Sequence, residues 1–249
     1  SEMSESEHID EILAGWPYEA ESLNVRLAKG ADGRQVIQMR IDMGLLQLEV
    51  EGRPDGTKPH GEATFQDHLF AESLRNHPDW KLSEVECSEV DREFVQYYHR
   101  RMCWLKLREY RKAVSDADHT IGLMDFCAKY SPDDEWTYSH EQYRPFVMFH
   151  RVHATALAAL EDDGAEIAVQ EINHGLRQLK EEVFEDIDQE DFEDDELIQR
   201  LIELRETLRQ QYEVGRTLEE QLGDAIESEQ YELAAELRDQ LAHRKTKVH

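Results

Sequence analysis

Apolar and polar residues alternate along residues 24–50, which is the pattern of β-strands with one buried face. After Gly44 the apolar phase shifts by one residue, and this slip predicts a β-bulge or a strand break. We expect a small β-hairpin or meander within a β-rich element at residues 1–60. Two or three strands are not stable alone in water, and they must pack on helices or on a second copy. The apolar positions before and after the slip are Ile37, Met39, Ile41 and Met43, and then Leu46, Leu48 and Val50.

From Gly61 onward the apolar spacing changes to three and four residues, which predicts amphipathic helices. A first helix is expected at residues 62–76, because Pro78 disfavours helical backbone in the residue before it. Two longer helices are expected on either side of a turn near Tyr110, and a weaker pair spans residues 146–179. The chain is therefore expected to be mainly α-helical after its N-terminal strands.

The turn between the two longer helices combines a leucine, a tyrosine and small residues at fixed spacing: Leu107, Tyr110, Ala113 and Thr120, with Arg108 beside the leucine. This segment resembles the helix pair of tetratricopeptide (TPR) repeats, in which glycine is usual where the arginine stands here. The small residues recur at Ala168 and Gly175, an offset of 55 residues, whereas the family repeats every 34 or so. The resemblance implies TPR-like helix pairs at residues 61–180, each with an open apolar face that a neighbour must cover.

Eleven of the sixteen residues from 181 to 196 are acidic. This composition predicts a solvated, mobile connector, and a docking strip for a basic partner is the alternative. Asp194 and Asp195, at the end of the run, are suited to the N-terminus of the next helix, since acidic side chains stabilise that end.

Leucines at spacings of four, three and four residues form a short heptad seam from Leu197 to Leu208. The seam predicts a long helix within residues 197–249. The apolar pattern allows this helix to continue past Gly215 into the C-terminal hairpin, although a glycine there weakens it by about 1 kcal/mol relative to alanine.

Two short amphipathic patterns follow between residues 218 and 244, with a break at Ser228, Glu229 and Gln230. A pair of such short helices has too little interior to be stable alone. Its apolar stripe must therefore be covered by another chain, or by the rest of this chain as in an ordinary packed hairpin. The apolar and small positions are Leu218, Leu222, Ala225 and Ile226 in the first pattern, and Tyr231, Ala234, Ala235, Leu237 and Leu241 in the second.

The run YELAAELRD at residues 231–239 closely resembles the UVR motif, a helical hairpin shared by the excision-repair proteins UvrB and UvrC. The resemblance implies a protein-pairing device that meets another helical hairpin, in the same protein or in a partner. The motif also occurs in Clp-type ATPases and stress-regulator proteins, so DNA repair and stress response both stay open. We expect the contact to be made by Leu222, Ile226, Tyr231, Ala234, Leu237, Arg238 and Leu241.

The chain carries 56 acidic and 28 basic residues, a formal net charge of −28. It should repel phosphate groups, so we expect no direct nucleic-acid binding, although the tail at residues 243–247 is locally basic. Residues 1–10 show no apolar signal segment, and no apolar run approaches the length of a membrane span. Cys87, Cys103 and Cys127 form no disulfide framework or zinc-binding pattern, which fits a reducing cytoplasm.

No catalytic arrangement is evident, since the chain lacks a phosphate loop and a nucleophile elbow. His150 and His153 have the spacing of two metal ligands on a helix, but core or surface histidines explain such a pair better. We therefore expect neither a metal nor a cofactor. The aromatic stretch that follows residue 130 predicts either a wedge packed between helix pairs or a peptide groove. The groove would be lined by Trp136, Tyr138, Tyr143 and Phe146.

These patterns predict a mainly α fold with four parts: a β-rich element at 1–60, a TPR-like domain at 61–180, an acidic connector at 181–196, and a long helix plus UVR hairpin at 197–249. The expected function is that of a non-enzymatic cytoplasmic adaptor. Its hairpin would pair with a UvrB/UvrC-type or Clp-type partner, or with a second copy of the chain as a homodimer. The alternatives are a metal-dependent enzyme and a peptide-binding TPR-like module.

Overall fold

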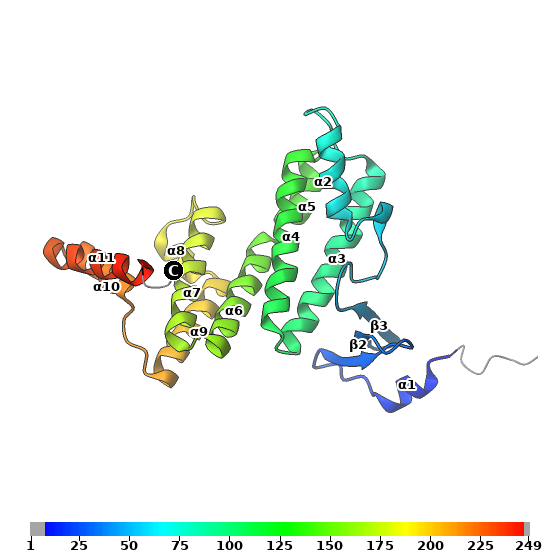
Figure 1. The fold of residues 1–249 in the computed structure, drawn as a ribbon, viewed down its shortest axis with the longest axis horizontal. Coiled ribbons are helices and arrows are strands. Elements are labelled where there is room, and N and C mark those ends of the chain that lie inside the picture. Colours follow the sequence, from blue (N-terminus) through cyan, green and yellow to red (C-terminus); the bar gives the residue numbers. More distant parts are fainter. Residues whose placement is uncertain (1–7, 247–249) are drawn as a thin grey trace, which may run out of the picture. The chain divides into compact units, whose positions relative to one another are not determined.

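The computed structural model describes residues 8–246, so Lys247 of the basic tail lies outside the described residues. The fold is mainly helical with a small N-terminal antiparallel sheet, which confirms the predicted fold class (Figure 1). The chain forms two compact units, residues 1–155 and residues 156–249. Their boundary lies inside helix α6 (Arg144–Asp162), within the range predicted as the TPR-like domain. None of the described helices is long and apolar enough to cross a membrane.

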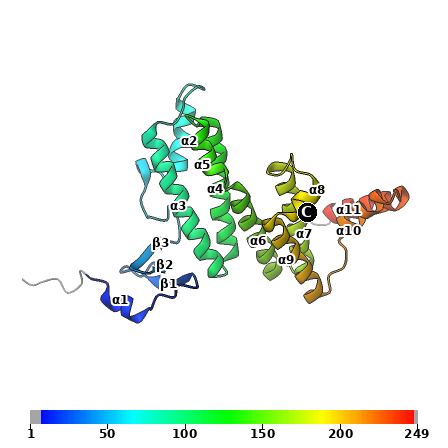
Figure 2. The same cartoon turned by 180° about the vertical axis from the view of Figure 1, so that it is seen from behind.

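The N-terminal element consists of helix α1 (Asp10–Gly15) and the strands β1 (Asn24–Lys29), β2 (Gln35–Ile41) and β3 (Gly44–Glu49), visible together in Figure 2. The strands form an antiparallel meander in the order β1-β2-β3, and Ile41 pairs with Gly44 across the β2–β3 turn. The phase slip is thus a strand break. Residues that pair across the two strands lie on the same face of the sheet. Met39 pairs with Leu46 and Ile37 with Leu48, so the apolar positions have odd numbers in β2 and even numbers in β3. Met43 lies in the turn and is 86% exposed.

The sheet packs on two long helices, α3 (Glu84–Lys106) and α4 (Tyr110–Tyr130). The apolar face predicted from the alternating pattern contributes Ile37, Met39 and Leu48, which share one cluster with Trp104 and Ala113. These helices supply the cover that three strands need in water.

Arg100 of α3 anchors the end of the sheet to the helices. Its Nη1 donates to the backbone oxygens of Glu49 and Gly52, at 3.1 and 2.8 Å, and its guanidinium forms two hydrogen bonds of 2.9 Å with Asp116 on α4. Because both members of this ion pair are buried, the contact holds the strand end, α3 and α4 in one arrangement.

Helix α3 begins and ends at recognisable signals. Ser83 and Glu86 form a capping box at its start. After its last turn, Arg108 adopts the left-handed conformation with φ of 59°, which glycine reaches more easily. The turn therefore has a left-handed residue at the position where TPR repeats use glycine, while the TPR-like resemblance itself stays a prediction.

Further helices enclose a second apolar cluster of the first unit. A 3-10 turn, η1 (Pro59–Gly61), leads into α2 (Phe65–Arg75), which ends before Pro78, as predicted. The helix begins after the cap residue Thr64 and not at residue 62 as expected. Helix α5 (Asp134–Glu141) follows α4. The buried members of this cluster include Phe65, Leu69, Leu82, Val90, Leu123, Met124 and Val147.

The second unit begins with helices α7 (Ala165–Glu182), α8 (Gln189–Asp194) and α9 (Glu196–Tyr212), with α7 packed along α9. The acidic run is folded, which differs from the mobile connector expected. Phe192 of α8 is buried at 4% exposure, and Lys180 Nζ donates to the backbone oxygens of Phe184 and Ile187 at 2.9 and 2.6 Å. Apolar residues within the run thus outweigh the repulsion of its carboxylates. Asp195 caps α9, as predicted.

The predicted continuation of the leucine-rich helix into the hairpin is wrong. Helix α9 ends at Tyr212, and Glu213 then takes the left-handed conformation with φ of 54°. A new helix, α10 (Leu218–Glu227), starts at Thr217, whose hydroxyl accepts from the backbone N–H of Glu220 at 3.2 Å. The Thr-x-x-Glu spacing is a helix-start signal in the sequence, and it prevails over the continuous apolar pattern.

Candidate functional site

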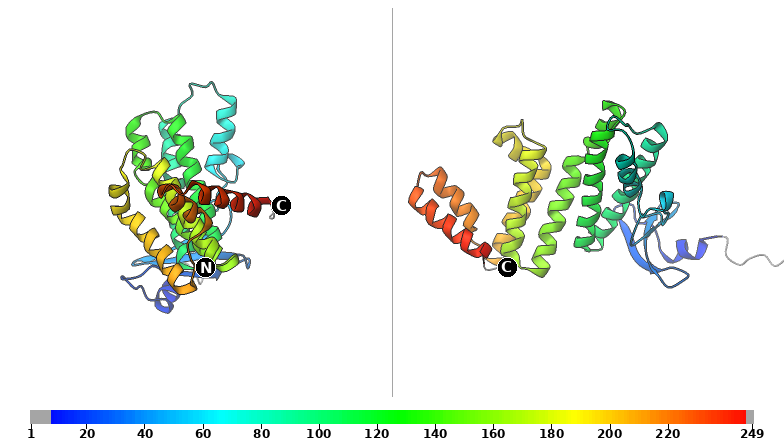
Figure 3. Two further views of the ribbon diagram at one scale, coloured as in Figure 1. Left: turned by 90° about the vertical axis from the view of Figure 1, so that its left-hand side faces the viewer. Right: turned by 45° about the horizontal axis from the view of Figure 1, so that its top comes forward.

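The C-terminal hairpin consists of α10 and α11 (Tyr231–Thr246), which lie side by side in both views of Figure 3. Its turn is closed by backbone hydrogen bonds. The N–H of Gln230 donates to the oxygen of Ala225 at 2.8 Å, and Glu229 adopts the left-handed conformation with φ of 57°. The break predicted at Ser228–Gln230 is therefore the turn that reverses the chain.

The interior of the hairpin is small. Ala225, Ala234 and Leu237 are its buried residues, at 2–3% exposure, and Leu218 and Leu222 pack against them partly exposed. Two of the three buried side chains are alanines, so the helices approach closely but remove little apolar area from water.

The structure divides the predicted partner-binding residues into two groups. Ala234 and Leu237 lie in the hairpin's own interior, with Leu222 and Leu241 partly buried. In this arrangement the buried pair holds α10 and α11 together and is not available to a second protein. The exposed group comprises Ile226 at 43%, Tyr231 at 67%, and Arg238. Contact with a partner stays a prediction for this second group.

Three exposed residues of α11 lie on one side of the helix, at spacings of four and three: Tyr231, Ala235 and Arg238, which we call the tyrosine flank. Leu233, 43% exposed, stands two residues from Tyr231 and so lies on the opposite flank of the buried stripe. Arg238 forms no side-chain hydrogen bond or ion pair with any residue between 8 and 246. The tyrosine flank thus presents an aromatic ring, a small residue and an unpaired cation.

A polar network attaches the start of α10 to α7 and α9. Glu220 accepts from Asn173 Nδ2 at 2.9 Å and also pairs with Arg209. Asn173 Oδ1 in turn accepts from Arg205 Nη1 at 2.9 Å. Burial tends to raise the pKa of Glu220, but the hydrogen bonds from Arg209 and Asn173 outweigh it, so the pKa lies below its usual value. The carboxylate is therefore stabilised in its charged form.

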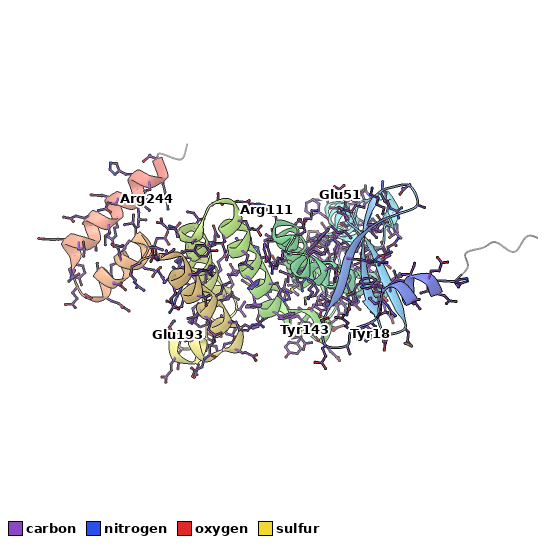
Figure 4. All side chains as sticks on the ribbon, turned by 90° about the horizontal axis from the view of Figure 1, so that it is seen from below. Tyr18, Glu51, Arg111, Tyr143, Glu193 and Arg244 are labelled. Carbon is purple, nitrogen blue, oxygen red and sulfur yellow. The ribbon has the colours of Figure 1, made fainter. Side chains whose placement is uncertain are left out.

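A second contact reaches the far end of α11. Arg244, labelled in Figure 4, has its Nη1 3.3 Å from Glu166 Oε1 of α7. Both side chains are more than half exposed, so this ion pair contributes little to stability. Arg177 of α7 also pairs with Glu219 of α10 at 3.2 Å, and these side chains are about half exposed. The network around Glu220 is therefore the most buried of the polar contacts that attach the hairpin to its unit.

The aromatic stretch contributes to a cavity of about 660 Å³ between α3, α4, α5 and α6 in the first unit. Of the predicted groove residues, Tyr143 and Phe146 line it, and Tyr143 stands at the surface in Figure 4. Trp136 packs instead against the apolar core, and its Nε1 donates to Asp91 at 3.0 Å. Tyr138 is 66% exposed and is not among the lining residues. The stretch therefore supplies both a wedge and part of a cavity wall.

Arg101 of α3 also lines this cavity, a position not predicted from the sequence. Its side chain is only 2% exposed. Its Nε donates to His150 Nδ1 at 3.1 Å, which requires the other nitrogen of that histidine to carry the ring proton. The available signal was its spacing of three and seven residues from Tyr98 and Phe94, which places an arginine on an apolar helix face.

The remaining candidates for chemistry lie in structural positions. The ring of His153 lies 5.8 Å from that of Phe149. Within residues 8–246 no three histidine, cysteine or acidic side chains are grouped as a metal ion would require. The three cysteines are buried and free, and burial raises the pKa of Cys87 to about 11 and that of Cys103 to about 12. These thiols are therefore protonated and poorly nucleophilic at neutral pH.

Comparison with known family models gives a match at the hairpin. Residues 214–245 match the family model described as UvrB/uvrC motif. No curated protein and no solved structure matches the chain. The match covers α10, its cap Thr217 and nearly all of α11, so it coincides with the hairpin.

Proposed function

We propose that this protein is a non-enzymatic adaptor whose C-terminal hairpin binds a helical hairpin of another polypeptide. The match of residues 214–245 to the UvrB/uvrC motif carries the proposal, because that motif is a protein-interaction module. The small interior of the hairpin supports it, since a motif with so few buried side chains gains stability from further packing.

The tyrosine flank is the surface that we assign to the partner. Tyrosine and arginine are enriched among residues that dominate binding energy, because they combine apolar area with a polar end. Ala235 lies between Tyr231 and Arg238 on this flank, and a small residue there lets a second helix approach closely. The two adjacent alanines then have separate roles. Ala234 allows close packing of α10, and Ala235 allows close packing of the partner's helix.

Three kinds of partner fit this proposal: a UvrB/UvrC-type protein, a Clp-type ATPase, or a second copy of the chain. The first two would place the protein in DNA repair or in the stress response. We propose a cytoplasmic location, which the free state of all three cysteines supports. The proposed absence of catalysis rests on the lack of catalytic sequence motifs.

Ala235→Glu tests the interface directly. A charge at this exposed position should block close helix approach and weaken binding about tenfold or more, while helix content stays unchanged because both residues favour helix. Leu233→Glu is the matched control, since it places the same charge on the opposite flank. Sedimentation of the full chain measures self-association, and calorimetry with the host's UvrB, UvrC and Clp proteins measures the other partners.

Two results would contradict the proposal: equal binding by Ala235→Glu and the unmodified chain, or no association with any of these partners. Ala234→Glu is a poorer test, because it buries a carboxylate inside the hairpin and disrupts α10–α11 packing itself.

The salt dependence of binding distinguishes self-association from binding to a basic partner. Two chains of net charge −28 repel each other, so self-association should strengthen with added salt, whereas binding to a basic partner should weaken.

A further inference from the structure

The cavity between α3, α4, α5 and α6 has no role in the proposed adaptor function. Phe94, Met124, Phe146 and Val147 give it apolar walls, and its volume of about 660 Å³ is that of a small-molecule site. Tyr143, which is 57% exposed, lies at its opening. The cavity can therefore be reached from solvent and can enclose an apolar group.

Arg101 brings a positive charge into these walls and forms no ion pair with any described residue. Its polar contacts are neutral, namely His150 Nδ1 at 3.1 Å and Thr120 Oγ1 at 3.5 Å. Asp116 attracts Arg101 through space, but its carboxylate is hydrogen-bonded to Nε and Nη2 of Arg100. No carboxylate of the described residues lies within ion-pair distance of Arg101. One terminal nitrogen, Nη2, forms no hydrogen bond with any described residue.

A buried charge without a counter-ion is unfavourable, and an anion that fills the site removes the penalty. Burial lowers the pKa of Arg101 to about 10, so the guanidinium is still protonated at neutral pH. The central carbon of its guanidinium lies over the ring of Tyr98, 5.6 Å from the ring centroid. The side chain is thus charged, 2% exposed and provided with a free donor group.

We propose that this cavity binds a small organic molecule that has one carboxylate and an apolar body. The carboxylate would accept hydrogen bonds from Arg101, and the body would lie among Phe94, Met124 and Phe146. A single negative charge fits better than several, because Asp91 also lines the cavity and the chain as a whole is strongly acidic. The fork of the guanidinium matches the geometry of a carboxylate.

A peptide is the less suitable occupant. Each of its residues brings a backbone N–H and C=O that need partners when buried. The hydroxyl groups of Thr120 and Ser139 in the walls already donate to the backbone oxygens of Asp116 and Trp136. Asp91 already accepts from Trp136 and lies 2.7 Å from His140 Nε2. A small acid carries its polar atoms at one end, where Arg101 can satisfy them.

Calorimetry on the full chain tests the site with phenylacetate, octanoate and their neutral amides, and with a Gly/Ser peptide that ends in Leu-Phe. At least one acid should bind about tenfold or more tightly than its amide, because a charged hydrogen bond is stronger than a neutral one. Arg101→Met should reduce this acid-to-amide ratio to about one. Arg92→Met is the matched control, since it removes an exposed arginine from the same helix.

A rim variant tests the site even if Arg101→Met fails to fold. Val95 is 54% exposed and lines the cavity, so Val95→Glu should weaken acid binding severalfold and leave amide binding unchanged. Val85→Glu, at 80% exposure on the same helix, should have no effect. The proposal is overturned if acids and amides bind equally, if Arg101→Met keeps the preference, if neither acid binds at millimolar concentration, or if only the peptide binds.

Discussion

The α3–α4 hairpin and the α10–α11 hairpin have the same topology, yet they bury very different side chains. The longer pair, with helices of 23 and 21 residues, encloses large groups such as Trp104 and Leu123. The C-terminal pair, with helices of 10 and 16 residues, deeply buries Ala225, Ala234 and Leu237. The stability that packing supplies depends on the apolar area removed from water. The longer hairpin can therefore serve as a scaffold, whereas the shorter one gains stability when it packs against another surface.

Their charged contacts differ in the same way. In the first unit Glu93 is fully buried, and it accepts from the backbone N–H groups of Phe65 and Gln66 at 2.8 and 3.0 Å while it pairs with Arg53. In the second unit the Glu220 network stays partly exposed. A buried, satisfied charge specifies one arrangement of its neighbours, whereas a partly exposed network can open at lower cost.

Leu123→Ala should produce the largest loss of stability. This side chain is fully buried in the second apolar cluster of the first unit, and truncation should lower the free energy of unfolding of that unit by about 3 kcal/mol through lost burial and a cavity. Leu74→Ala, at 74% exposure on α2, should change it by less than about 0.5 kcal/mol. Urea denaturation followed by tryptophan fluorescence measures both. Similar losses in the two variants would contradict this assignment of the core.

Leu237→Ala should have a smaller and local effect. It removes the largest of the deeply buried side chains of the hairpin, and we expect a loss of about 2 kcal/mol confined to residues 218–246. Hydrogen exchange should show faster exchange in α10 and α11 and no change in α3 and α4. Leu233→Ala, on the exposed opposite flank, should leave exchange almost unaltered. Faster exchange throughout the chain would mean that the hairpin is essential to the whole fold.

Glu220→Gln should have the smallest effect, and a pH-dependent one. The folded pKa of Glu220 lies below its unfolded value, so the carboxylate stabilises the attachment of α10 at neutral pH, by about 1 kcal/mol. As the pH falls below the unfolded pKa and through the folded one, this advantage disappears. Hydrogen exchange of α10 should therefore distinguish the variant from the unmodified chain at pH 7 and progressively less on acidification. A difference that grows with acid would contradict the assignment.

Much of this arrangement could be predicted from sequence because it depends on neighbours in the chain. The β2–β3 turn follows from the phase slip at Gly44, and the start of α9 from the acidic cap at Asp195. The hairpin follows from residues 231–239, whose pattern is specific enough to match a family. The break between α9 and α10 was also present, as the spacing of Thr217 and Glu220, although the apolar periodicity favoured a continuous helix.

The sequence by itself determined most of the helical and extended segments and where the strand-to-helix transition occurs, because periodicity and capping act over a few residues. It also showed that the C-terminal hairpin carries the UVR motif, because that pattern lies within one short segment. Only the tertiary structure decided that Ala234 is enclosed and Ala235 is exposed, and that Arg101 lines a cavity without forming an ion pair with any described residue. Burial and charge pairing depend on residues far apart in the chain, and helical spacing cannot specify which of them meet.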